Sequence, residues 1–202
     1  MGKKLFYPMR LRFMTSFGTL KLRKITWSEL FYDTLELAKK IAFAGFYPEL
    51  LVLVARGGLV VGRLLSDFLS IRRIANVSVR LYEGIGTAAK EPILEGSINS
   101  DEVRGKPVLV VDDIVDSGTT LSFVLKYISA HNPGEVRSAA LYVKPWAKTR
   151  PDFFVRVIEE WAVFPYEIRE TLESIPNEYQ SLLGLDSKVI EDIKNIVENS
   201  KR

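Results

Sequence analysis

Three acidic side chains follow a continuous apolar segment in the middle of the sequence. The segment is Val108 to Val111, and Asp112, Asp113 and Asp116 come after it. Continuous β-branched runs are typical of strands that are buried on both faces of a parallel sheet. We therefore expect Asp112 and Asp113 at the carboxyl end of a strand, where open α/β sheets bind their ligands.

A turn rich in small hydroxyl residues comes next, before a predicted helix. Its hydroxyls and backbone N–H groups lie beside a helix N-terminus, where the partial positive charge favours an anion. The turn consists of Asp116, Ser117, Gly118, Thr119 and Thr120. An ordinary capped helix, with Asp116 or Ser117 as its N-cap, would explain the helix start but not the two preceding acids. The combination predicts a pocket for a phosphorylated sugar.

A second glycine-containing turn, Arg56-Gly57-Gly58, follows the apolar run at residues 50–55. By itself it indicates only the tight strand-to-helix connection that an α/β unit needs, because glycine adopts backbone conformations closed to other residues.

These segments resemble the phosphoribosyl-diphosphate signature of the type I phosphoribosyltransferases. Residues 51–65, LVLVARGGLVVGRLL, are similar to the bacterial xanthine-guanine members, and the resemblance spans about residues 26–168. It implies that Asp112 and Asp113 engage the ribose hydroxyls, while Asp116 to Thr120 hold the 5′-phosphate. It also implies that Arg56, Gly57 and Gly58 bind the pyrophosphate, in a loop that usually contains a non-proline cis peptide.

Two pairs of residues further along the chain bear on which base is transferred. A lysine at a strand end is usually solvated and a tryptophan usually belongs to a core. Together, however, Lys144-Pro145 and Trp161-Ala162 resemble the 6-oxopurine phosphoribosyltransferases. The resemblance implies that Lys144 donates to O6, that Trp161 stacks on the purine, and that the main chain of Ala162 or Val163 meets the remaining edge. An ammonium donor disfavours the amino group of adenine.

The resemblance further implies Mg²⁺ as cofactor, held by Asp112 and Asp113 through water. Glu167 is a candidate for an acidic group near a second metal or near Lys144. Asp116 is the candidate catalytic base that accepts a proton from the purine.

The polar, glycine-punctuated segment from Glu83 to Gly105 is too long for a routine connection. We expect a mobile lid that excludes water from the reaction. Tyr82 directly precedes it and Lys90 lies within it, but the lid lacks the Ser-Tyr pair common in related lids.

The rest of the pattern predicts one α/β domain with a doubly wound, mainly parallel sheet flanked by helices, as in the type I phosphoribosyltransferase fold, with a small hood formed by terminal segments. Strands are expected at 50–55, 76–82, 108–112, 136–143 and 153–158, and helices at 26–45, 57–69 and 117–130. Beyond Trp161 the chain is expected to be helical, with an apolar stripe of Val189, Ile193, Ile196 and Val197. The expected domains are an N-terminal arm at 1–25, the phosphoribosyltransferase domain at 26–168, and a helical extension at 169–202 packed on the domain or on a partner subunit.

Composition narrows the alternatives. The 202 residues include no cysteine and one histidine, His131, so disulfides, thiolate metal sites and histidine triads have no support. No signal peptide or bilayer-spanning run is recognisable, and we expect a cytoplasmic protein with no membrane partner. Residues 1–24 hold seven of the 28 Lys and Arg residues and no acid.

The sequence therefore predicts a Mg²⁺-dependent phosphoribosyltransferase that converts phosphoribosyl diphosphate and guanine, hypoxanthine or xanthine to a nucleoside 5′-monophosphate and pyrophosphate. The family is commonly dimeric or tetrameric, so we expect a homodimer or homotetramer. The alternative is a regulator of the same fold that senses phosphoribosyl diphosphate and binds nucleic acid through the basic arm. Seven charges spread over 24 residues are not a compact basic run, so a nucleic-acid partner is not expected.

Overall fold

The structure is a computed structural model that describes residues 21–83 and 90–200. These residues form two compact units. The larger unit contains residues 28–159, and the smaller unit joins residues 21–27 to residues 160–200. Most of the basic arm, at residues 1–20, lies outside the described residues.

The larger unit is built on a six-stranded sheet with the order β4-β3-β2-β5-β6-β7. Its strands are β2 (Leu50–Ala55), β3 (Ile74–Glu83), β4 (Lys90–Glu95), β5 (Pro107–Val115), β6 (Glu135–Val143) and β7 (Phe153–Val157). All neighbours are parallel except β3 and β4. The mainly parallel, doubly wound sheet expected from the sequence is confirmed.

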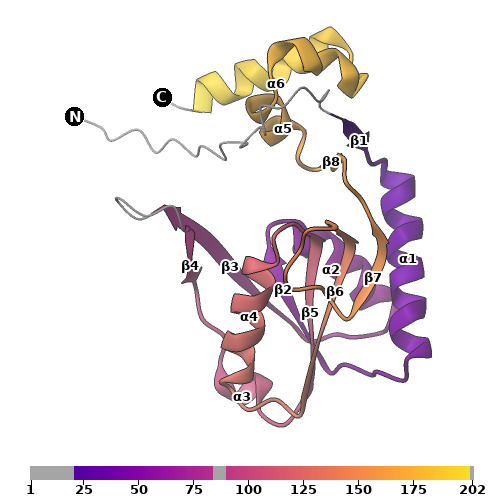
Figure 1. Cartoon of the computed structure of the whole chain (residues 1–202), viewed down its shortest axis with the longest axis vertical. Coiled ribbons are helices and arrows are strands. Elements are labelled where there is room, and N and C mark those ends of the chain that lie inside the picture. Colours follow the sequence, from indigo (N-terminus) through magenta and orange to yellow (C-terminus); the bar gives the residue numbers. More distant parts are fainter. Residues whose placement is uncertain (1–20, 84–89, 201–202) are drawn as a thin grey trace. The chain divides into compact units, whose positions relative to one another are not determined.

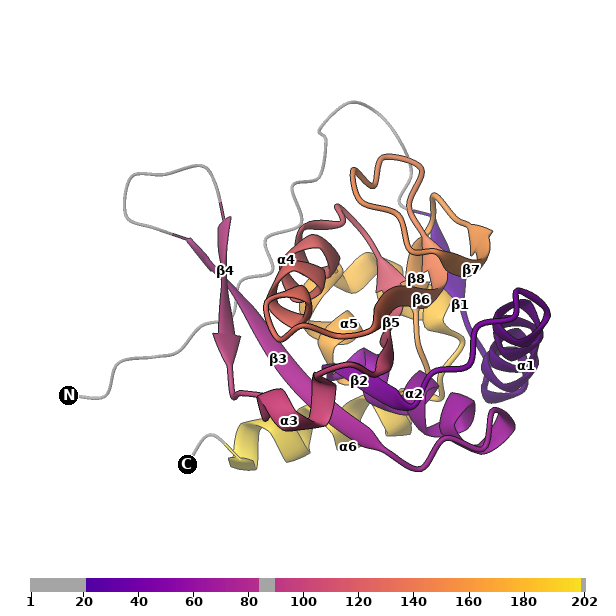
Figure 2. The same ribbon diagram turned by 90° about the horizontal axis from the view of Figure 1, so that it is seen from below.

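Helices cover both faces of this sheet (Figures 1 and 2). They are α1 (Trp27–Phe43), α2 (Gly57–Phe68), α3 (Ser100–Val103) and α4 (Thr119–Ser129). Figure 2 shows α4 on one face, with α1 and α2 on the other. The runs LLVLV in β2 and VLVV in β5 are buried throughout, as strands covered on both faces must be.

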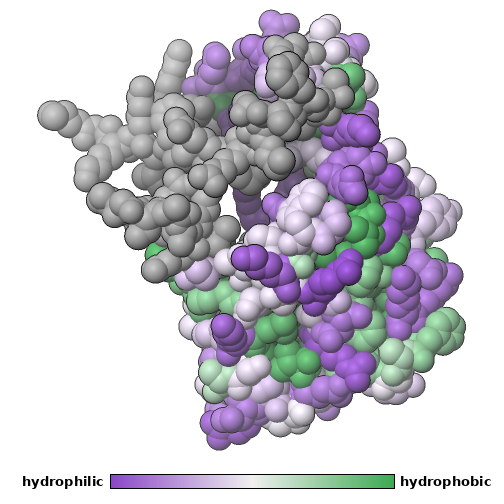
Figure 3. Space-filling view, in the orientation of Figure 1, coloured by the Kyte–Doolittle hydropathy of each residue, from purple (hydrophilic) through white to green (hydrophobic). Residues whose placement is uncertain are grey.

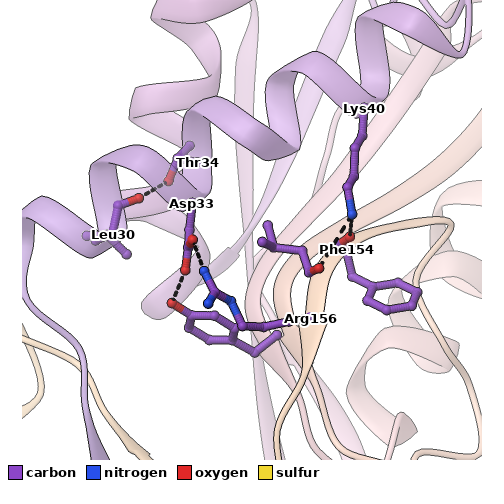
Figure 4. A network of polar contacts seen from close by, with 8 residues as sticks. Leu30, Asp33, Thr34, Lys40, Phe154 and Arg156 are labelled. Carbon is purple, nitrogen blue, oxygen red and sulfur yellow. Dashed lines mark hydrogen bonds and ion pairs between the residues drawn. The ribbon is translucent and has the colours of Figure 1, made fainter.

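A polar network ties α1 to the edge of the sheet (Figure 4). Asp33, although buried, pairs with Arg156 of β7 and accepts a 2.5 Å hydrogen bond from the Tyr142 hydroxyl of β6. Burial, followed by the hydrogen bond to Asp33, raises the pKa of Tyr142 well above its ordinary value of 10.0. Further along α1, Lys40 donates a 2.8 Å hydrogen bond to the carbonyl of Phe154.

The segment expected to be a mobile lid contains a strand and a short helix. Residues 90–95 form β4, which pairs antiparallel with β3 from Ser78↔Glu95 to Glu83↔Lys90, and residues 100–103 form α3. The sequence did not predict β4 because this part of the chain is rich in polar residues. One face of a two-stranded antiparallel extension can stay in water, so such a strand needs no continuous apolar run. Residues 84–89 lie outside the described residues.

The smaller unit contains a two-stranded parallel sheet of β1 (Leu22–Lys24) and β8 (Trp161–Val163). It also contains α5 (Ile168–Ser174), the 3₁₀ helix η1 (Asn177–Leu183) and α6 (Ser187–Ser200). The expectation that the chain is helical beyond Trp161 was therefore wrong for β8.

The predicted apolar stripe on α6 was also partly wrong. Ile190 and Ile193 pack against the small core around Val163, whereas Val189 and Ile196 are exposed. The apolar residues of α6 are therefore divided between a packed face and a solvated face.

On the face seen in Figure 1, hydrophilic side chains are dispersed and hydrophobic residues form separate patches (Figure 3). Within the described part of the chain, no helix combines the length and apolar character needed to cross a bilayer.

Candidate active site

Three adjacent parallel strands bring predicted phosphoribosyl-diphosphate residues and the predicted purine-binding lysine to the same side of the sheet, where these strands end. Arg56 follows β2, Asp112 and Asp113 lie in β5, and Lys144 follows β6. Strand β5 continues to Val115, three residues beyond its expected end at Asp112. The backbone N–H of Lys144 donates a 2.9 Å hydrogen bond to the carbonyl of Val115, which aligns the two strand ends.

The two adjacent acids have different surroundings. Asp113 is 5% exposed, and its Oδ1 accepts a 2.7 Å hydrogen bond from the N–H of Ile114. A Cβ added at Gly57 would overlap the Asp113 carboxyl group, so this acid lies directly against the glycine turn. Asp112 is half-buried, and its Oδ1 accepts a 3.0 Å hydrogen bond from the N–H of Asp113. The pair thus leaves Asp112 partly open to solvent and packs Asp113 against the turn.

The Arg56 turn leads directly into a helix. The peptide bond between Ala55 and Arg56 is cis, as the resemblance implied. Gly57 and Gly58 are the first two residues of α2, whose backbone N–H groups have no partner in the preceding turn of the helix. A Cβ at Gly58 would overlap the carbonyl of Val111, so a larger residue would push the turn off β5. The exposed Arg56 and this helix N-terminus can together bind an anion.

The hydroxyl-rich turn has the geometry of a second anion site. Gly118 has φ +84° and precedes α4, so the helix starts at Thr119 and neither Asp116 nor Ser117 is its N-cap. Ser117 Oγ accepts a 3.2 Å hydrogen bond from the N–H of Thr119 and lies 3.0 Å from Thr119 Oγ1. A Cβ at Gly118 would lie 2.5 Å from the carbonyl oxygen of Thr149. Only glycine meets both the backbone angle and this close approach.

Asp116 has a partner that sequence reasoning missed. Its side chain is exposed, and its Oδ1 accepts a 2.8 Å hydrogen bond from the indole Nε1–H of Trp146. Trp146 stands two residues after Lys144, and this proximity was the only available signal.

Lys144 is buried although it carries a cationic side chain. It is 6% exposed, its Nζ donates a 3.2 Å hydrogen bond to the carbonyl of Glu159, and it lies 5.4 Å from the ring centroid of Trp146. Burying an ammonium group costs desolvation free energy, so Lys144 is a candidate for a ligand-binding role.

Comparison with known proteins agrees with this geometry. A family model described as the phosphoribosyl transferase domain matches residues 26–171. The chain belongs to the phosphoribosyltransferase family. Over 152 residues it is 30% identical to a xanthine-guanine phosphoribosyltransferase of Gluconobacter oxydans (strain 621H), covering 74% of this chain and 86% of that relative.

Two solved structures resemble this phosphoribosyltransferase. A purine phosphoribosyltransferase from Pyrococcus horikoshii Ot3 is 31% identical, with a TM-score of 0.66 and coverage of 73% of this chain and 94% of that one. A xanthine-guanine-hypoxanthine phosphoribosyltransferase from Helicobacter pylori is 30% identical, with a TM-score of 0.64 and coverage of 75% and 98%. The sheet and its helices have the type I phosphoribosyltransferase fold.

The remaining candidates of this phosphoribosyltransferase lie in the smaller unit. Trp161 and Ala162 are half-buried in β8, and Val163 is fully buried. The carbonyl of Val163 accepts a 2.9 Å hydrogen bond from Ile25, and Glu167 immediately precedes α5. Their place beside the purine, and that of Glu167 beside a metal, stay predictions from the sequence.

Asp112 and Asp113 of the larger unit suit magnesium only when a bound substrate supplies further ligands. Among the described residues of the phosphoribosyltransferase, no three metal-binding side chains form a group that could hold a metal ion. Mg²⁺ commonly keeps several waters and binds one or two carboxylates together with substrate phosphates. Asp112 and Asp113 supply a donor set of that kind.

Proposed function

We propose that this phosphoribosyltransferase joins a 6-oxopurine to C1 of phosphoribosyl diphosphate. Relatives that are 30% and 31% identical act, by their names, on purines. The observation that carries the proposal is the buried ammonium of Lys144, which lies beyond the end of β6 next to the acid-bearing strand β5. An ammonium held in a dry environment favours a carbonyl oxygen such as O6 over an amino group.

Each part of the activated sugar has a matching group at this edge of the sheet. The half-buried Asp112 can accept hydrogen bonds from the ribose hydroxyls. The turn from Ser117 to Thr120 can bind the 5′-phosphate through its hydroxyls and the N-terminal N–H groups of α4. Arg56 and the first N–H groups of α2 can hold the pyrophosphate. Three anchors fix the sugar so that C1 faces the base.

The reaction forms a bond between a purine nitrogen and C1 while the bond between C1 and the pyrophosphate oxygen breaks. In the proposal, Asp116 accepts the proton that the purine nitrogen loses, and Arg56 stabilises the charge that develops on the leaving pyrophosphate. Magnesium, held through water by Asp112 and Asp113, would supply further neutralisation of the diphosphate charge.

The roles of the purine-binding residues in the proposal are those expected from the sequence. Lys144 donates to O6, Trp161 stacks on the ring, and the main chain of Ala162 or Val163 meets the remaining edge. The proposal also includes the cytoplasmic location and the homodimer or homotetramer expected from the sequence.

The test is an assay of nucleotide formation from phosphoribosyl diphosphate with guanine, hypoxanthine, xanthine, adenine, uracil and orotate, each with and without Mg²⁺. We expect kcat/KM for at least one oxopurine to exceed that for adenine by tenfold or more, and activity to require the metal. Preference for adenine or a pyrimidine would refute the substrate assignment, and full activity after chelation would refute the magnesium requirement.

A further inference from the structure

The loop after β6 is fastened to the phosphate-binding turn after β5. The N–H of Lys148 donates a 2.9 Å hydrogen bond to the carbonyl of Ser117, and Gly118 closely approaches the backbone of Thr149. Two backbone contacts therefore fix the loop that carries Trp146 relative to the turn that carries Asp116.

Trp146 contacts two groups assigned to the reaction. Its Nε1–H donates to Asp116 Oδ1 at 2.8 Å, and its ring centroid lies 5.4 Å from the Lys144 ammonium. The side chain is nevertheless 55% exposed, so core packing does not account for its place. An exposed indole gains little by burial, and its defined contacts are to the proposed base and to the proposed purine-reading lysine.

We propose that Trp146 is a positioning residue that holds the Asp116 carboxylate in the orientation needed for proton transfer. This inference rests on the proposed role of Asp116 as base. An exposed aspartate samples several side-chain rotamers, and a hydrogen bond to one carboxylate oxygen selects among them. The indole donates to Oδ1, which leaves Oδ2 available to the proton of the purine. Because general base catalysis depends first on geometry, this restraint acts on turnover rather than on substrate binding.

Trp146→Phe tests the role, since it removes the N–H and keeps an aromatic ring beside Lys144. We expect kcat to fall about three- to tenfold, while KM for phosphoribosyl diphosphate and for the purine changes less than twofold. Trp27→Phe, at another exposed tryptophan, is the matched control and should leave both parameters unchanged. A rise in KM at constant kcat would overturn the proposal.

A double-mutant cycle separates this inference from the assignment of the base. In an Asp116→Ala background, Trp146→Phe should change kcat by less than twofold, because the carboxylate through which it acts is gone. The same loss in both backgrounds would overturn the role of Trp146 alone. If Asp116→Ala keeps wild-type turnover, the base assignment fails and the role of Trp146 fails with it.

A spectroscopic measurement does not depend on turnover, so it tests the hydrogen bond even if the protein uses none of the assayed purines or pyrimidines as a substrate. The indole N–H proton signal of Trp146, identified in a ¹H–¹⁵N spectrum by its loss in Trp146→Phe, should move upfield in Asp116→Ala as the hydrogen bond is lost. An unchanged signal would show that the two side chains are not bonded and would overturn the inference.

Discussion

At the scale of single residues, the two turns of the site differ in how they restrict substitution. At Gly58 a side chain is excluded by the carbonyl of Val111, and at Gly118 it is excluded by both φ and Thr149. The side chain of Asp116 is exposed, so packing does not explain its identity. The following variants probe the chemistry of Asp116 and of Lys144.

Asp116→Asn removes the charge but keeps the shape of the proposed base. Because an amide cannot accept the proton of the purine, we expect kcat to fall about 10²-fold or more. KM for phosphoribosyl diphosphate, measured by steady-state kinetics, should differ from the wild-type value by no more than a few-fold. Asp192→Asn on the exposed side of α6 is the control and should behave as wild type. Near-normal turnover of Asp116→Asn would remove Asp116 from the mechanism.

Lys144→Ala removes the proposed donor to O6. A hydrogen bond from a charged group is worth about 1.5–3 kcal/mol, so kcat/KM for oxopurines should drop roughly ten- to a hundredfold, and their advantage over adenine should narrow. Lys144→Met keeps most of the buried aliphatic stem and should show the same loss. Lys126→Ala, at an exposed position on α4, should have no effect. Equal losses for every base would mean that Lys144 does not read O6.

At the scale of elements, α1 is fixed to the sheet by buried polar contacts as well as by apolar packing. Asp33 accepts from Tyr142 of β6 and pairs with Arg156 of β7, so one carboxylate joins a helix to two strands. The side chain of Arg156 is 41% exposed, and solvent screens its charge. Most of the free energy that this network contributes to folding therefore comes from the buried hydrogen bond between the Tyr142 hydroxyl and Asp33.

Asp33→Ala removes the carboxylate that accepts from the Tyr142 hydroxyl. We expect the free energy of unfolding to fall by about 1–3 kcal/mol, measured by urea denaturation, because a buried polar group loses its acceptor. Glu36→Ala lies on the exposed side of the same helix, where its ion pair with Lys39 is half-exposed. It should change stability by less than about 0.5 kcal/mol. If the two variants were equally stable, the network would contribute nothing measurable.

At the scale of the whole molecule, Tyr142 links stability to alkaline pH. Its pKa is raised in the folded state, so the folded protein keeps this proton above pH 10.0 while the unfolded chain releases it. The contribution to stability is full below pH 10 and is lost as pH rises further, by at most about 1.4 kcal/mol per pH unit. The stability difference between wild type and Tyr142→Phe should shrink between pH 9.5 and 11. A difference that stays constant over this range would contradict the coupling.

Local sequence was sufficient for the parallel strands of the larger unit and for the residues that gather where those strands end. Buried parallel strands need continuous apolar runs, and connections to helices need small residues, so residues 50–58 and 108–120 carried their own structural signal. The positions of Arg56, Asp112 and Lys144 at one edge followed, because parallel neighbours end on the same side.

Tertiary contacts decided what local patterns could not. The burial of Asp113 depends on its approach to Gly57, and the partner of Asp116 comes from a loop 30 residues away. The pairing of β4 with β3, and of β8 with β1, depends on hydrogen bonds between backbones, which polar or short segments form as readily as apolar ones. Residue type and spacing thus determined the chemistry available to this protein. The packing of distant segments determined which of those groups are buried, which stay exposed, and which side chains they contact.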